Sequence, residues 1–178
     1  MEGNSENTES ALLFNVDNLR LAEQIGLQLL QRSWLLGTAE SCTGGSVAGI
    51  LTEIPGSSQW FAGGLVTYSN EWKQKLLGVQ ALTLEKYGAV SSETVAEMLD
   101  GLLDRYALQA GIAVSGIAGP GGAVPGKPVG TVYIGVALGE ERRVCRRQFS
   151  GDRRAVRIQS CTDALQELLR LLHGSLAS

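Results

Sequence analysis

The sequence predicts an α/β fold: a three-layer α/β/α arrangement around a mixed, largely parallel sheet of about five strands that ends in an antiparallel hairpin. Two observations predict it. Amphipathic segments with helical spacing alternate with short apolar segments over most of the chain, which is typical of a sheet covered by helices on both faces. Nearer the C-terminus, an apolar alternating segment, a Gly-containing turn and a charged segment follow one another, which is typical of a hairpin.

The first elements are expected to be two helix–strand pairs. Apolar residues recur at helical spacing over about 17–33, and a short apolar strand over 34–39 follows. The turn at 40–45 leads to a second helix, which the Pro-Gly-Ser-Ser segment at 55–58 stops. The next strand is expected at 64–68, where the sequence reads GLVTY.

The rest of the chain is expected to form further helical segments and the remaining strands. These are, in order, a helix capped by Ser69 and ended by Gly78, a helical turn at 82–87, a helix at 92–106, strands at 110–115, 129–138 and 142–149, and a helix that Asp152 caps and that runs to about 172. The length of 178 residues suits one domain, expected over 17–173 behind a flexible N-terminal arm over 1–16.

Composition excludes several classes of function. The formal net charge is −3, so a general nucleic-acid binder is not indicated. No apolar run approaches the roughly 20 residues that span a bilayer, and the polar N-terminus does not resemble a secretory signal. Three cysteines without CxxC spacing predict neither a disulfide framework nor a zinc cluster, so a cytoplasmic location is the simplest expectation.

The single histidine, His173, lies close to the C-terminus. A single histidine in this position nearly excludes a Ser-His-Asp triad, a Cys-His dyad and a His-rich metal site. Any hydrolytic chemistry therefore needs a different base. In sheets of the expected kind, ligands bind beyond the carboxyl ends of the parallel strands. That rule selects three segments of this chain: Glu40–Gly45, Tyr68–Lys73 and Ser115–Gly122.

The first of these segments offers a nucleophile. Ser41 lies at an expected strand-to-helix turn, where the following backbone N–H groups can hold an anion or a developing oxyanion. Gly44 and Gly45 allow a ligand to approach the backbone closely. The alternative is that Ser41 or Thr43 only caps the helix. Cys42 lacks a histidine partner and is interpreted as a packing thiol.

The second segment offers a base. Lys73 falls in the first turn of the expected helix, where the helix dipole and partial burial lower the pKa of an ammonium group toward a value useful for proton abstraction. Tyr68, at the strand end, could relay a proton or hold the lysine. The alternative is that Lys73 is an ordinary solvated lysine and Tyr68 an edge aromatic residue.

The third segment offers an anion site. The glycines of 115–122 can direct several N–H groups at one phosphate or carboxylate. Arg153 and Arg157, one helical turn apart, are further candidates for a phosphate. The stretch 121–127 matches G-x-x-x-x-G-K, but Pro128 stands where a P-loop needs Ser or Thr, so a nucleoside triphosphatase is not indicated.

Six motifs together resemble one protein family. They are TAESCTGG at 38–45, VTYSN-x-x-K at 66–73, YGAVS at 87–91, SGIAGPGG at 115–122, KPVGTVY at 127–133 and FSGDR-x-x-VR at 149–157. In this order, from about Leu19 to Leu172, they resemble the C-terminal domain of the competence-damage-inducible protein CinA. The N-terminal molybdopterin-binding-like domain of full-length CinA proteins is not found among these residues.

The resemblance implies an amidohydrolase that converts nicotinamide mononucleotide and water to nicotinic acid mononucleotide and ammonia, in pyridine-nucleotide salvage, without a metal or a cofactor. It implies Ser41 as nucleophile and Lys73 with Tyr68 as the base system. A homo-oligomer is expected, with a dimer favoured, and neither a nucleic acid nor a membrane is an expected partner. The alternative is a non-catalytic nucleotide-binding or regulatory member of the family. The residues expected to contact the substrate are Glu40, Thr43, Gly44, Gly45, Asn70, Ser115, Gly116, Gly119, Gly121, Gly122, Arg153 and Arg157.

Overall fold

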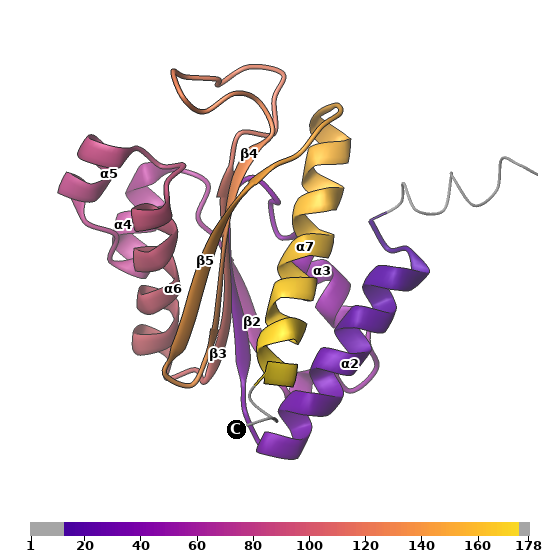
Figure 1. Cartoon of the computed structure of the whole chain (residues 1–178). Coiled ribbons are helices and arrows are strands. Elements are labelled where there is room, and N and C mark those ends of the chain that lie inside the picture. The colour runs from indigo at the N-terminus through magenta and orange to yellow at the C-terminus, as the bar shows by residue number, and fades with distance from the viewer. Residues whose placement is uncertain (1–12, 175–178) are drawn as a thin grey trace, which may run out of the picture.

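A five-stranded sheet lies at the centre of the molecule, with helices on both of its faces (Figure 1). The structure is a computed structural model that describes residues 13–174. The strands are β1 (Leu36–Glu40), β2 (Phe61–Val66), β3 (Ala110–Gly116), β4 (Thr131–Leu138) and β5 (Glu141–Gln148), in the spatial order β2-β1-β3-β4-β5. The helices are α2 (Val16–Arg32), α3 (Ser46–Thr52), α4 (Asn70–Leu77), α5 (Ala81–Tyr87), α6 (Ser92–Tyr106) and α7 (Arg153–Gly174), with a short 3₁₀ turn, η1 (Ser57–Gln59).

The pairing of the strands is mixed. β1 pairs in parallel with β2 and with β3, whereas β4 pairs antiparallel with β3 and with β5. Only β4 therefore runs against the other described strands, and the mixed sheet with its closing hairpin is confirmed. Glu40 lies opposite both Val66 of β2 and Val114 of β3. The carboxyl ends of the three parallel strands thus meet at one edge of the sheet. In sheets of this kind, ligands bind at that edge.

The helices divide between the two faces of the sheet. Helices α3 and α7 cover one face, with α2 packed outside them, and α6 covers the other face, with α4 and α5 packed against it (Figure 1). Each face has its own cluster of buried apolar side chains, in which Leu36 belongs to the α7 side and Ala39 to the α6 side. The three-layer arrangement is therefore confirmed.

Capping residues explain where the helices begin and end. Asn15, Ser69 and Ser91 each accept a hydrogen bond from a backbone N–H in the first turn of α2, α4 and α6. Gly78 ends α4 in the left-handed conformation, which glycine adopts at low cost. Asp152 accepts a backbone N–H of the first turn of α7. The expected caps at Ser69 and Asp152, and the expected stop at Gly78, are confirmed.

Two expectations about boundaries need correction. The strand expected at 64–68 is β2, which starts earlier, at Phe61, and ends at Val66. The glycines of its first half hide its strand character, and the chain leaves the sheet after Thr67 to reach the cap of α4. The arm expected over 1–16 lies largely outside the described residues, and α2 already begins at Val16.

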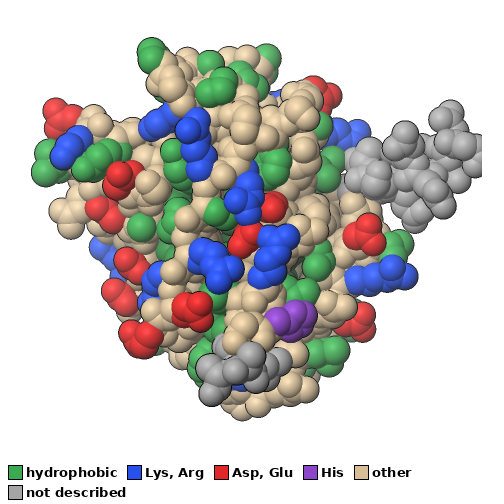
Figure 2. Space-filling model, viewed as in Figure 1, with side chains coloured by type: hydrophobic (Ala, Val, Ile, Leu, Met, Phe, Trp, Pro, Cys, Tyr) green, Lys and Arg blue, Asp and Glu red, His purple; other side chains and the backbone are tan. Residues whose placement is uncertain are grey.

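Ion pairs link the edge strand β5 to α7. Basic and acidic side chains lie close together over these two elements (Figure 2). Arg147 contacts Asp163 at 2.8 Å and Glu167 at 2.5 Å, and Arg143 and Arg170 also pair with Glu167. The charged segment of the hairpin therefore serves packing on this face. Within residues 13–174, no helix combines the length and apolar character needed to cross a bilayer.

Candidate active site

Two of the three expected segments meet directly at the carboxyl edge of the sheet. Ser41 follows β1, and Lys73 extends from the first turn of α4. Lys73 Nζ lies 3.1 Å from Ser41 Oγ and donates a hydrogen bond to the backbone oxygen of Thr67 at 2.7 Å. The structure therefore places a hydroxyl and an amine within proton-transfer distance.

Burial changes the proton affinity of this amine. Lys73 is fully buried, and no acidic side chain among the described residues forms an ion pair with it. Removal from water disfavours the charged form, which lowers the pKa of Lys73 from 10.5 to about 8. Near neutral pH a usable fraction of Lys73 is then unprotonated. Burial instead raises the pKa of the neighbouring Cys42 thiol to about 11, so Cys42 remains a neutral packing residue.

Residues 41–46, which we name the serine turn, connect β1 to α3. Ser41 N–H donates to Val114 O, and Gly44 N–H donates back to Ser41 O at 3.0 Å. Gly44 and Gly45 have φ values of 63° and 89°, in the region that favours glycine. The two glycines therefore serve the sharp change of direction that brings Ser41 to the edge of the sheet.

Glu40 supports the serine turn from within the protein. It is fully buried, and its carboxylate accepts hydrogen bonds from the N–H groups of Val47 at 3.1 Å and Ala48 at 2.8 Å, and from the hydroxyl of Thr38 at 3.2 Å. The N-cap of α3, Gly45, has no side chain to satisfy these N–H groups, so Glu40 takes that role. The carboxylate of Glu40 thus caps α3, and its expected contact with the substrate stays a prediction.

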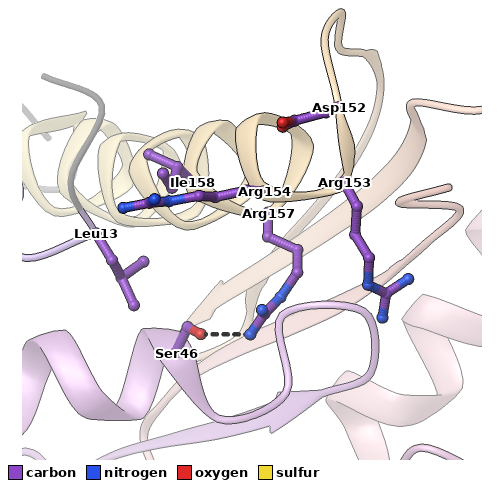
Figure 3. Close-up of a pocket in the computed structure, with 7 residues that line it drawn as sticks. All are labelled: Leu13, Ser46, Asp152, Arg153, Arg154, Arg157 and Ile158. Carbon is purple, nitrogen blue, oxygen red and sulfur yellow. Dashed lines mark hydrogen bonds between the residues drawn. The ribbon is translucent and has the colours of Figure 1, made fainter. Parts of the chain in front are cut away.

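Arg157 supports the same turn from α7. Its Nε donates to Cys42 O at 3.1 Å, and its Nη2 donates to Thr43 O at 2.8 Å and to Ser46 Oγ at 3.0 Å. Figure 3 shows the side chain pointing down from the helix to Ser46. The N–H donors of Nε and Nη2 are therefore engaged by the serine turn, and the expected contact of Arg157 with a phosphate stays a prediction.

A cavity of about 520 Å³ lies beside this contact, on the α7 side of the turn (Figure 3). It is lined by Leu13, Ser46, Asp152, Arg153, Arg154, Arg157 and Ile158. Ser41 and Lys73 are not among its lining residues, whereas Arg153, which also contacts Tyr68, is one of them.

Tyr68 and Arg153 form a second contact at the rim of the site. Arg153 donates to the Tyr68 hydroxyl at 3.0 Å and to Gly119 O at 2.8 Å, which joins α7 to two of the expected segments. Tyr68 is 60% exposed. Its hydroxyl makes no hydrogen bond to Lys73 within the described chain, where Thr67 O holds the amine instead. Of the two roles expected for Tyr68, that of holding Lys73 is therefore not seen in the structure.

The comparison with known proteins decides the family. The model of the CinA C-terminal domain matches residues 18–172, nearly all of the described chain. The chain belongs to the CinA C-terminal domain family. It is 51% identical to the nicotinamide-nucleotide amidohydrolase PncC of Enterobacter agglomerans over 84% of this chain and 92% of that protein. A CinA-like protein of Thermotoga maritima is 42% identical over 91% of this chain but only 40% of its own length.

Solved structures of CinA superfamily proteins share this fold. A protein from Enterobacter cloacae superposes with a TM-score of 0.84 at 34% sequence identity, over 87% of this chain and 92% of that chain. One from Klebsiella pneumoniae 700603 also gives a TM-score of 0.84, at 36% identity over 88% and 98% of the two chains. The resemblance inferred from the six motifs is thus confirmed.

The other residues expected to contact the substrate differ in their burial and in their contacts. Ser115 is buried, and its hydroxyl donates to Ala89 O at 2.6 Å, so its side chain is engaged in packing. The loop after β3 exposes Gly121 and Gly122, whereas Gly119 is buried against Val129. Gly116 is half-buried at the end of β3, and Asn70 is exposed at the start of α4.

Thr43 is fully buried, and its hydroxyl has no hydrogen-bond partner among the described residues.

Sequence reasoning missed the part played by Thr67. Its backbone oxygen holds Lys73 Nζ, and a backbone acceptor carries no residue-specific signal. It also missed that Arg157 binds the serine turn, because a motif gives the spacing of an arginine but not the direction of its side chain.

The cap formed by Glu40 leads to a stability prediction. Glu40→Gln is expected to lower the free energy of unfolding by about 2 kcal/mol, because an amide replaces a charged acceptor and turns an N–H donor toward the donors of α3. Urea denaturation at pH 7 measures this difference. The matched control is Glu53→Gln, an exposed carboxylate at the other end of α3. Equal stability of both variants and the wild type would contradict the capping role.

Proposed function

We propose that this chain is an amidohydrolase that converts nicotinamide mononucleotide and water to nicotinic acid mononucleotide and ammonia. The observation that carries the proposal is the 3.1 Å contact between Lys73 Nζ and Ser41 Oγ in a protein with one histidine, His173, far along α7. The names of the relatives that are about half identical to this chain support the choice of substrate. The cytoplasm is the proposed location, since three free thiols suit a reducing compartment.

The first step joins Ser41 to the carboxamide carbon in a tetrahedral intermediate, which becomes an ester of Ser41 when the C–N bond breaks. Unprotonated Lys73 takes the proton of Ser41 Oγ while Oγ bonds to the carboxamide carbon, and the π electrons of the C=O bond move to its oxygen. The lowered pKa of Lys73 supports this role, because an ordinary lysine is almost wholly protonated at neutral pH. Backbone N–H groups of the serine turn stabilise the negative oxygen.

The later steps release the two products. The tetrahedral intermediate collapses, its C–N bond breaks, and protonated Lys73 gives its proton to the leaving nitrogen, which departs as ammonia. A water molecule then attacks the ester carbon while Lys73 accepts one of its protons. The Ser41 Oγ–C bond breaks, Ser41 regains a proton from Lys73, and the carboxylic acid leaves. Each proton passes through a single amine, so no histidine is needed.

The rim formed by Tyr68 and Arg153 is proposed to hold the rest of the nucleotide. Arg153 uses only part of its five N–H donors on Tyr68 and Gly119, so it can still bind a phosphate. Tyr68 lies beside it and is exposed on the same rim. In this proposal Tyr68 contacts the substrate, and the proton path runs through Lys73 alone.

The predictions about partners stay predictions. A homodimer is the proposed assembly. The outer edge of β2, where Val66 is exposed, pairs with no other described strand and is a surface on which a second copy could pair. No nucleic-acid partner is proposed, in keeping with a net charge of −3.

The proposed function is tested by product analysis. Purified protein and nicotinamide mononucleotide are expected to yield ammonia and nicotinic acid mononucleotide in equal amounts. The riboside lacking the 5′-phosphate is expected to react with a much lower kcat/KM, because it lacks the group that Arg153 holds. Tight binding of the nucleotide in calorimetry without release of ammonia would instead indicate a non-catalytic binding protein.

A further inference from the structure

The contacts of Arg157 fix the direction of one peptide group beside the nucleophile. In a trans peptide the C=O and the N–H of the same unit point in opposite directions. Arg157 Nε holds the oxygen of Cys42, which belongs to the same peptide unit as the N–H of Thr43. The N–H of Thr43 must therefore point away from α7.

Most other N–H groups near Ser41 already have acceptors. Gly44 N–H donates to Ser41 O, and Ser46 N–H donates to Thr43 O. The N–H groups of Val47 and Ala48, at the start of α3, donate to Glu40. Within residues 13–174, the N–H groups of Thr43 and Gly45 have no protein acceptor, whereas the N–H of Cys42 acts on its own thiol. Of the two groups without an acceptor, that of Thr43 is nearer to Ser41 along the chain.

Arg157 is suited to hold this arrangement. Its planar guanidinium spans three acceptors of the serine turn, at both ends of the turn, which a lysine could not do with a single point charge. It extends from the first turns of a helix of 22 residues that packs on the sheet. The turn is thus fixed from α7 by Arg157 and from β1 by Glu40.

We propose that Arg157 is a positioning residue, which holds the carbonyl oxygens of Cys42 and Thr43 so that the Thr43 N–H is directed at the oxyanion formed on the substrate of Ser41. The inference rests on the proposed function only in requiring Ser41 as nucleophile, and it does not require a nucleotide substrate. It differs from a phosphate-binding role for Arg157, in which the arginine would act on substrate affinity.

Steady-state kinetics separates these two roles. Arg157→Ala is expected to lower kcat about 100-fold with KM changed less than threefold, since loss of one oxyanion donor costs about 10²–10³ in kcat. Arg157→Lys is expected to recover only a small part of the rate, whereas guanidinium ion added to Arg157→Ala restores part of it. The matched control is Arg154→Ala, which removes a neighbouring arginine that makes no hydrogen bond to the serine turn and is expected to leave kcat within twofold.

A nucleotide-free reaction keeps the inference independent of the substrate. A small fluorophosphonate phosphonylates serine nucleophiles and develops the same negative oxygen. Labelling of Ser41, followed by mass spectrometry, is expected to be about 100-fold slower in Arg157→Ala than in the wild type and unchanged in Arg154→Ala. Wild-type labelling without hydrolysis of the nucleotide would overturn only the proposed substrate. Equal labelling rates in folded Arg157→Ala and wild type, or a raised KM with unchanged kcat, would overturn the positioning role.

Discussion

Ser41→Ala is expected to release ammonia from nicotinamide mononucleotide at least about 10⁴-fold more slowly than the wild type. The variant retains Lys73 and the serine turn but has no atom that can form the ester. Cys42 cannot substitute, because burial raises the pKa of its thiol to about 11 and leaves it protonated. A coupled assay for ammonia, with the protein at high concentration, measures the residual rate.

Two controls separate loss of chemistry from loss of fold. Calorimetry with the product, nicotinic acid mononucleotide, is expected to give nearly the same affinity for Ser41→Ala and the wild type, because removal of one oxygen atom leaves the rim of Tyr68 and Arg153 in place. Acid-quenched wild-type protein is expected to contain a fraction of chains with a nicotinoyl-nucleotide ester on Ser41. Wild-type turnover by Ser41→Ala would exclude the serine nucleophile.

The convergence of Ser41 and Lys73 could be predicted because it follows from topology. Ser41 directly follows β1, and Lys73 lies in the first turn of α4, the helix that follows β2. The carboxyl ends of neighbouring parallel strands lie at the same edge of a sheet. The periodicity of α4 then places Lys73 on the side of the helix that faces the protein, four residues before the buried Leu77. Local pattern and fold class therefore indicate Ser41 and Lys73 as candidates, and the resemblance to the CinA family selects them over a helix cap and a solvated lysine.

The role of Glu40 could not be predicted in the same way, because it depends on which helices cover which face. Side chains alternate along a strand, so Thr38 and Glu40 share one face of β1 and Ala39 takes the other. Ala39 packs in the cluster of α6, and the carboxylate of Glu40 meets α3. Continued alternation carries Ser41 to the side from which Lys73 approaches. Knowing this in advance would have required the placement of α3 and α4.

The two motif arginines show a similar limit. Arg153 and Arg157 are four residues apart, so they emerge from nearly the same side of α7, and the sequence predicts one shared function. Their long side chains reach in different directions, and one binds the rim of the site while the other binds the serine turn (Figure 3). Side-chain reach, which sequence spacing does not specify, separates their roles.

Lys73→Met is expected to lower kcat/KM at least about 10³-fold, because it removes the base and the acid of the proposed mechanism at nearly constant side-chain volume. In the wild type, kcat/KM is expected to rise with pH and to level off above pH 8, since Lys73 must lose its proton to act and its pKa is about 8. The pH–rate profile over pH 6–10 measures this. A rate that rises only near pH 10.5, or a rate independent of pH, would contradict the assignment of the base.

The same pKa predicts a change in stability that does not depend on activity. The pKa of Lys73 is about 8 in the folded protein and about 10.5 in the unfolded chain, so between these values the unfolded chain binds more protons. The free energy of unfolding of the wild type therefore rises with pH through this window, relative to Lys73→Met, by about 1.4 kcal/mol for each pH unit. Urea denaturation at pH 7, 8, 9 and 10 gives the free energy of unfolding of both proteins. Subtracting the value for Lys73→Met from that of the wild type at each pH removes the contributions of the other titrating groups. A difference that does not change with pH would mean that Lys73 keeps an ordinary pKa, and a lysine charged at neutral pH could not take the proton of Ser41.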